Sequence, residues 1–587
     1  MRAKRAPITT HNTAPCARIL FAVGLAYVLL AIGSTAAYAA VPTSAQQDAA
    51  ELRRMQEREA QTREQLERAP DVRLSPPVAA PVRLPQQETP CFPIRQLELR
   101  GDVPDTPFGS RFGWVLDALA GPSQDDGPLR KCLGAQGVSV LLHRAQDALV
   151  AKGFVTTRIF AQPQDLSSGS LVLTVVPGRI RAIRFAEGAP TSLHTALAAQ
   201  PGDVLNLRDI EQALENFKRV PTADADIQIA PADQPDQSDL LISYQHSFPL
   251  RLSVSVDDSG SKSTGKYQGS STVSWDNPLG LNDLFYVTAT GDLGGGDPGP
   301  RGTGGTTVHY SLPYGYWTLG TTFSNSSYYQ SVAGLNQNYV YRGTSGNAEI
   351  KVARLVYRDA VRKTTVHLKA FERHSSNFVD DTEVLVQRRA IGGWELGVGH
   401  KEFVGAATLE GNLAYKRGTG DFDAMRAPEE ASGEGYSRFG LLAADASVSL
   451  PFKAGSQALR YNGALRWQDN TTPLTPQDRF SLGGRYTVRG FEGDVSLVGE
   501  RGYLLRNELS AALGDSGQEV YCGVDTGEVS GPSADLLVGK RLSGAFIGLR
   551  GSFKKLQYDL FVGTPLYKPE GFKASDVAAG FSLNLSF

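Results

Sequence analysis

The feature that most constrains the fold is a period-two alternation that runs from about residue 249 to the end of the chain. Its last segment is the clearest case, with Val577, Ala579, Phe581, Leu583, Leu585 and Phe587 separated by Ala578, Gly580, Ser582, Asn584 and Ser586. Successive side chains of a β-strand point to opposite faces of the sheet, so one face is apolar and the other polar. Glycine, asparagine and aspartate punctuate the pattern at short intervals, as turns do. Residues 249–587 are therefore predicted to form one large antiparallel sheet.

Soluble sandwiches share this alternation with membrane barrels, but several features favour a barrel. The strands are about ten residues long, which suits a tilted bilayer crossing, and aromatic residues lie near strand ends. Connections also alternate between short (near 551–554, 514–518 and 451–456) and long (563–576, 531–542, 470–500 and 417–436). Outer-membrane barrels have short periplasmic turns and long external loops. At roughly 20 residues per strand and connection, we expect a closed all-β transmembrane barrel of 16 antiparallel strands.

Composition and charge exclude several other classes. Only 41% of residues are hydrophobic and 20% are charged, which excludes a bundle of membrane helices because each span needs about 20 consecutive apolar residues. The 59 basic and 61 acidic residues nearly balance, so nothing indicates a nucleic-acid partner. Serine, histidine and acidic residues form no nucleophile arrangement or metal-ligand spacing. We therefore expect neither an enzyme nor a cofactor or metal site.

The amino terminus resembles an export signal. Basic residues precede an apolar run at 19–32, and Ala37 and Ala39 supply the small residues of a cleavage site. A membrane anchor is the alternative, but the run is shorter than the roughly 20 residues of a bilayer span. We expect a signal peptide at residues 1–39 and an oxidising compartment. There Cys91 and Cys132 are a candidate disulfide, with two buried free thiols as the alternative.

Two segments follow the signal peptide. Residues 40–68 contain strong helix formers from Gln46 to Glu67 without a continuous apolar stripe. Such a helix is either solvated or lodged in a polar cavity, and the sequence alone favours the solvated interpretation. Residues 69–90 hold six prolines, which disfavour helix and sheet and predict an extended linker.

A small module is repeated before the barrel. Residues 91–177 predict the order β-α-α-β-β, with strands at 94–99, 154–160 and 170–176 and helices near 114–119 and 138–151. Residues 178–248 predict the same order, with strands at 180–185, 227–230 and 239–244 and helices near 193–198 and 207–217. In the second copy, Asn206 is a suitable N-cap for a helix with one apolar face.

Two short motifs carry a resemblance to a known family. The longest barrel loop contains Val488-Arg489-Gly490-Phe491, and a later strand carries Val524-Asp525-Thr526-Gly527. These resemble the two signature motifs of the Omp85 superfamily. The chain from Gln46 onward is similar to TpsB transporters of two-partner secretion, the exporters of haemolysins, filamentous adhesins and contact-dependent inhibition toxins. Further matches are at 91–94, 152–158, 207–212 and 276–280.

The resemblance implies a fold and an internal contact. It implies that the two repeats are POTRA domains, that the helix at 40–68 plugs the pore, and that the barrel has 16 strands. It also implies that the long loop folds into the barrel so that Arg489 meets Asp525. Strand parity independently points Asp525 and Gly527 toward the lumen. The residues alone leave open whether Arg489 is simply a solvated loop residue.

The resemblance also implies a function. We expect an outer-membrane transporter of a Gram-negative bacterium, whose periplasmic POTRA domains recognise an unfolded, secreted β-helical exoprotein of the TpsA type. The barrel would carry that partner to the cell surface. The alternatives are an assembly factor that inserts other barrels and a passive porin. We expect contact with outer-membrane lipid, no nucleic acid and a monomeric protein.

Overall fold

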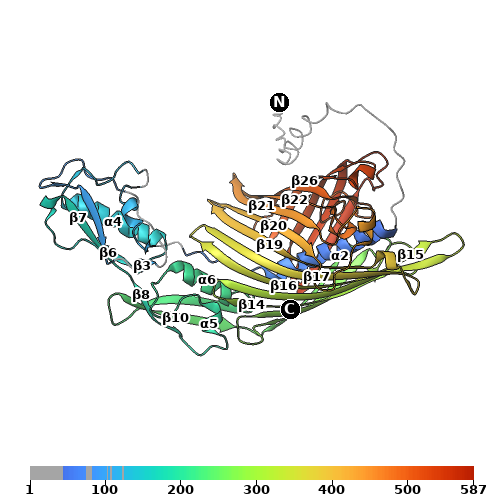
Figure 1. Ribbon diagram of the computed structural model, residues 1–587, viewed down its shortest axis with the longest axis horizontal. Coiled ribbons are helices and arrows are strands. Elements are labelled where there is room, and N and C mark those ends of the chain that lie inside the picture. Colours follow the sequence, from blue (N-terminus) through green and yellow to red (C-terminus); the bar gives the residue numbers. More distant parts are fainter. Residues whose placement is uncertain (1–43, 75–81, 102–103, 106–108, 122–123) are drawn as a thin grey trace, which may run out of the picture.

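The computed structural model describes residues 44–74, 82–101, 104–105, 109–121 and 124–587. The predicted signal peptide lies outside these residues. Figure 1 shows a large β-barrel and a helix (α2, Ser44–Glu67) running inside it. Two smaller α/β units lie beside one end of the barrel, at the left of the view. Within the described ranges, no helix has the length and apolar character of a membrane span.

Sixteen antiparallel strands form the barrel, as predicted. The first strand, β11, pairs with both β12 and the last strand, β29, and so closes the sheet. A two-residue strand, β18 (Thr382–Glu383), adds to the end of β17. The sixteen strands are β11 (Leu250–Asp257), β12 (Tyr267–Asp276), β13 (Leu284–Gly294), β14 (Gly302–Tyr314), β15 (Trp317–Ala333), β16 (Asn338–Arg358), β17 (Arg362–Val379), β19 (Arg389–Val404), β20 (Ala407–Thr419), β21 (Gly440–Ala454), β22 (Gln457–Asn470), β25 (Arg501–Ala512), β26 (Gln518–Ser530), β27 (Arg541–Phe553), β28 (Leu556–Tyr567) and β29 (Ala578–Ser586).

The two faces of the barrel wall differ as the alternation predicts. Along β12, Val273 and Trp275 are about half exposed on the outside, whereas Thr272 and Ser274 are buried inside. The expected strand length of about ten residues is wrong for β15, β16 and β17, which have 17, 21 and 18 residues. These strands continue to pair beyond the length needed to cross a bilayer, because hairpin pairing does not stop at the membrane surface.

The two repeats share one sheet topology. In the first, the sheet order is β2-β7-β6, and in the second it is β8-β10-β9. In both, the first strand is parallel to the last, and the last is antiparallel to the middle one. Their elements are β2 (Gln96–Arg100), α3 (Val115–Ala118), α4 (Ala135–Ala151), β6 (Arg158–Phe160) and β7 (Ser170–Val176), then β8 (Arg179–Phe185), α5 (Leu193–Ala196), α6 (Leu207–Phe217), β9 (Ala223–Pro231) and β10 (Gln237–His246).

Each repeat has its own apolar core, in which the long helix packs on the sheet. The side chain of Asn206 caps α6 by accepting a hydrogen bond from the Arg208 N–H at 2.8 Å, as predicted. The strand expected at 154–160 is shorter, because only Arg158–Phe160 pair with β7. The remaining described elements are short: β1 (Phe92–Pro93), β3 (Pro104–Asp105), β4 (Gly109–Ser110), β5 (Cys132–Leu133), β23 (Phe480–Leu482), β24 (Leu497–Gly499), and the 3-10 turns η1 (Leu166–Ser168), η2 (Leu385–Gln387), η3 (Pro428–Ala431), η4 (Pro476–Asp478) and η5 (Ala534–Leu536).

Candidate functional site in the barrel lumen

The long connection between β22 and β25 folds back onto the barrel wall. Its hairpin, β23–β24, pairs Phe480–Leu482 with Leu497–Gly499. Val488 and Phe491 of the loop motif are buried in an apolar cluster with side chains from the hairpin and from β25, β26 and β27. The ring of Phe491 packs edge-on against Phe572, which lies in the connection after β28, at 5.8 Å between centroids. Apolar burial therefore fixes the loop on both sides of Arg489.

Arg489 and Asp525 meet inside the barrel. The guanidinium donates from Nε to Oδ2 of Asp525 at 2.8 Å and from Nη2 to Oδ1 at 3.0 Å. The backbone N–H of Arg489 donates a third hydrogen bond to Oδ2 at 3.0 Å. Such a forked pair fixes orientation as well as distance. Asp525 has no exposed surface and the Arg489 side chain is only 10% exposed, so this ion pair is buried.

The pair continues into a charged network that the sequence did not reveal. Nη1 of Arg489 donates to Glu508 of β25 at 2.6 Å, and Arg550 of β27 donates to the other oxygen of Glu508 at 2.7 Å. The Arg489 guanidinium lies 3.5 Å from the centroid of the Phe546 ring, a cation–π arrangement. Strand parity places Glu508 inside the barrel, but only the loop conformation makes it a partner of Arg489.

Glycines allow the loop backbone to approach the wall. Gly490 has φ of +113°, a conformation that other residues avoid, and a Cβ there would lie 2.7 Å from the carbonyl oxygen of Thr564. On the wall, a Cβ at Gly527 would lie 2.7 Å from Cδ2 of Leu482 in the loop hairpin. Both glycines of the two motifs are therefore contact positions between loop and wall.

Helix α2 lies in the lumen, so the solvated interpretation of this segment is wrong. The Tyr328 hydroxyl donates to Asp48 at 2.5 Å near one end of the helix, and the Tyr286 hydroxyl donates to Glu67 at 3.0 Å at the other. Between them, Arg58 donates to Gln268 at 2.8 Å. Arg63 pairs with Glu349 at 2.6 Å. The charged faces of the helix thus bind an equally polar wall.

The helix also contacts the folded-in loop. Nη2 of Arg54 donates to the carbonyl oxygen of Gly493, two residues after Phe491 of the loop motif, at 2.9 Å. Lys262, in the connection between β11 and β12, binds Glu492 at 3.0 Å and Asp494 at 2.9 Å. Movement of the helix would therefore break a contact with the loop.

The helix does not fill the lumen. A cavity of about 660 Å³ remains between Gln61 and Gln65 of the helix, Tyr486 of the loop and the walls formed by β11 and β25–β29. Because its lining is largely polar, this space suits water. The helix nevertheless crosses the bore along its length (Figure 1).

The first repeat is joined by a disulfide. Cys91 and Cys132, at the short β1–β5 pairing, are bonded with an S–S distance of 1.98 Å. The proline-rich linker is attached beside this bond, because the Glu88 carboxylate accepts hydrogen bonds from the N–H groups of Gly134, Gln136 and Gly137 at the start of α4. Such a contact satisfies donors that a helix start leaves free.

A second linker contact involves Asp126. Although burial alone would raise it, the pKa of Asp126 lies well below its ordinary value, because the Lys131 ammonium, the Leu84 N–H and the Arg144 guanidinium all bind the carboxylate. The Leu84 N–H donates at 2.8 Å and Arg144 at 2.5 Å. Leu84 itself is buried in the core of the first repeat. The C-terminal part of the linker is therefore folded as part of the first repeat.

Comparisons with known proteins agree with this architecture. The family described as "Haemolysin secretion/activation protein ShlB/FhaC/HecB" matches residues 236–551, and POTRA domain families match residues 113–178 and 179–231. The outer membrane transporter CdiB-2 of Burkholderia pseudomallei is 36% identical over 549 residues, covering 91% of this chain and 92% of the relative. The haemolysin transporter protein ShlB of Serratia marcescens is 27% identical, covering 77% and 78%.

Solved structures give the same result. CdiB from Acinetobacter baumannii has a TM-score of 0.78 and 30% identity, covering 93% of this chain and 100% of that one. CdiB from Escherichia coli has a TM-score of 0.77 and 25% identity with the same coverage. Together with the family match over more than half of the chain, these likenesses confirm the expected resemblance. The chain therefore belongs to the ShlB/FhaC/HecB family of haemolysin secretion/activation proteins, the TpsB outer-membrane transporters of two-partner secretion.

Proposed function

We propose that this transporter carries one unfolded exoprotein from the periplasm through its barrel, and that α2 is a plug that must leave the lumen first. The observation that carries this proposal is the polar helix inside a closed barrel of 16 strands, connected through the linker to the POTRA domains. Most contacts of the helix are hydrogen bonds and ion pairs, which water can replace, and its apolar contacts are few, chiefly Leu52 against Tyr328 and Tyr341. A helix held in this way exposes only a small apolar surface when it leaves.

The partner is proposed to be a secreted β-helical protein of the TpsA type. TpsB transporters act with such exoproteins, and an unfolded β-helical chain offers extended segments. These can add to an open sheet edge, where main-chain hydrogen bonds supply affinity. The nine-residue strand β9 is at one edge of the second POTRA sheet. We propose this edge as one place of capture.

The apolar outside of the barrel is proposed to contact lipid, and the protein to act as a monomer. Val273, Phe323, Ile350, Leu396 and Ile547 are all at least two fifths exposed on different strands. Such a belt favours insertion in the outer membrane, where this family resides.

Gene deletion tests the function directly. A strain without this protein should lose one surface protein while its other outer-membrane proteins stay at normal levels. A general loss of barrel proteins from the outer membrane would instead support an assembly factor. Unchanged surface proteins would contradict the proposal.

A further inference from the structure

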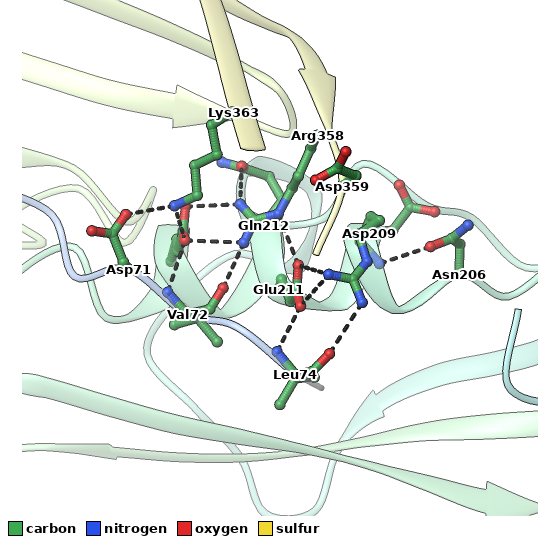
Figure 2. A network of polar contacts seen from close by, with 12 residues as sticks. Asp71, Val72, Leu74, Asn206, Asp209, Glu211, Gln212, Arg358, Asp359 and Lys363 are labelled. Atoms are coloured by element: carbon green, nitrogen blue, oxygen red, sulfur yellow. Dashed lines mark hydrogen bonds and ion pairs between the residues drawn. The ribbon is translucent and has the colours of Figure 1, made fainter. Parts of the chain in front are cut away.

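A four-residue part of the linker, Asp71–Leu74, lies between the second POTRA domain and the periplasmic end of the barrel (Figure 2). Side chains of helix α6 form hydrogen bonds with its main chain. The Val72 N–H donates to Glu215 at 2.8 Å, and the Leu74 N–H donates to Glu211 at 2.6 Å. The carbonyl oxygen of Leu74 accepts a hydrogen bond from Arg208 at 3.1 Å.

The barrel completes this set of contacts. Arg358, at the end of β16, donates to the carbonyl oxygen of Val72 at 2.7 Å. Residues 72 and 74 thus each have their N–H and C=O bound by a charged side chain. An extended chain repeats its direction every second residue, so two sets of donors and acceptors spaced in this way fit an extended segment.

The linker side chains alternate between the two walls. Val72 and Leu74 pack against the apolar core of the second POTRA domain. Asp71 faces the barrel, where it pairs with Lys363 at 2.7 Å and Lys401 at 2.5 Å. The guanidinium of Arg73 lies 3.9 Å from the centroid of the Phe403 ring, also on the barrel. This alternation is that of a strand in a groove.

The groove is built from charges that also bind one another. Glu211 pairs with Arg208 at 2.8 Å and with Arg358 at 3.0 Å, and Glu215 pairs with Arg358 at 2.9 Å. Glu211 has no exposed side-chain surface and Arg358 has 3%. The two carboxylates are bound by two guanidiniums and by Lys363, which pairs with Glu215 at 2.5 Å, so the cluster can stay assembled when the linker leaves. They would then present free acceptors and donors for the main chain of another peptide.

We propose that this groove is a binding site for an extended peptide with an acidic residue followed by apolar residues at alternate positions, and that the linker occupies it at rest. A segment of the exoprotein with this pattern competes with Asp71–Leu74 for the groove. The identity of the competitor rests on the proposed function, whereas the existence of the site rests on the contacts above. Main-chain recognition of this kind reads conformation and tolerates varied sequences.

The linker is covalently attached, so its effective concentration at the groove is in the millimolar range. A free peptide therefore needs the groove emptied. The probe is a fluorescent synthetic peptide with the sequence of residues 68–74. Its binding is followed by fluorescence anisotropy on the purified full-length protein in detergent. The double variant Val72→Asp/Leu74→Asp empties the groove and leaves α6 and Arg358 unchanged.

We expect the peptide to bind the double variant at least tenfold more tightly than it binds the unmodified protein. A peptide with aspartate at both apolar positions should bind neither protein. Val82→Asp is the matched control, because it also adds an acid to the linker at a side chain that is 62% exposed. It should behave as the unmodified protein. Equal binding to the control and the double variant, or binding to neither, would overturn the proposal.

A milder pair, Val72→Ser/Leu74→Ser, keeps the test decisive if the aspartates disturb folding, which heat-modifiable gel mobility would reveal. In the same emptied background, Lys363→Ala should weaken peptide binding, because the acidic residue loses a partner. The deletion strain separates the two proposals. Peptide binding together with unchanged surface proteins would refute export but keep the site, and normal export without peptide binding would refute the site alone.

Discussion

The ion pair between Arg489 and Asp525 leads to a quantitative prediction. Replacing Arg489 by Gln removes both guanidinium bonds to Asp525 and the bond to Glu508, while the backbone N–H can keep its own bond. The buried carboxylate then lacks its main counter-charge, a loss that costs about 3–5 kcal/mol. Nε of Arg506 lies 3.7 Å from Asp525 and offers partial replacement. We therefore expect about 3 kcal/mol, the lower end of this range.

Hydrogen exchange of the loop amides measures this cost. Amides near Gly483–Phe491 exchange when the loop opens locally, so their rates report the free energy of opening. About 3 kcal/mol corresponds to exchange that is on the order of 100-fold faster, since each 1.4 kcal/mol is a factor of ten. Mass spectrometry on the protein in detergent can resolve such a change. Secretion of the partner should fall in parallel if the loop must stay in place.

A double-mutant cycle can refute this reasoning. Asp525→Asn removes the other charge, and the combined variant should cost clearly less than the sum of the two single variants. If the costs add within about 0.5 kcal/mol, the pair does not couple loop to wall. Arg501→Gln is the control, because Arg501 and Asp469 form a half-exposed pair at 3.9 Å. That pair should contribute less than about 1 kcal/mol.

Three further predictions concern the helix and the first POTRA domain. Deleting residues 46–67 should raise single-channel conductance in planar bilayers, and an unchanged conductance would contradict the plug. Replacing Cys91 and Cys132 by serine should destabilise the first POTRA domain by about 4 kcal/mol, because the unfolded chain regains the entropy of a loop with a 41-residue separation. If this domain resists protease equally well in the variant and in the unmodified full-length protein, the prediction is contradicted. Because the pKa of Asp126 is lowered on folding, its carboxylate stabilises the domain above the unfolded value of about 3.9 and loses this effect as pH falls further. Asp126→Asn should remove this acid sensitivity, as monitored by the same proteolysis, and an unchanged pH profile would contradict it.

The barrel was predictable because its alternation reports directly which side chains face outward and which face the lumen. Because the outer face of a membrane barrel is apolar, the parity of β26 alone places Asp525 and Gly527 in the lumen. Strand lengths were less predictable. Pairing in β15, β16 and β17 continues beyond the membrane, and no apolar pattern marks the point at which a hairpin leaves it.

The lumen was harder to predict, because apolar patterns report burial only where burial is apolar. The buried residues of α2 include Asp48, Glu51 and Arg53. Charged residues of this kind, considered alone, predict a solvent-exposed helix. Likewise, the loop partner of Asp525 was implied by family resemblance, and Glu508 was not identified. The choice of partner depends on how a 30-residue loop folds, which strand parity does not determine.

The position of Asp71 limits how far α2 can move. From Glu67 to Asp71 the chain can reach at most roughly 14 Å, whereas the 24 residues of the helix span about 36 Å. While Asp71 is held by Lys363 and Lys401, the segment from Glu67 to Asp71 is too short to let the helix slide out of the bore. Under the proposed plug function, opening the pore therefore requires the release of Asp71 from Lys363 and Lys401 at the periplasmic end of the barrel.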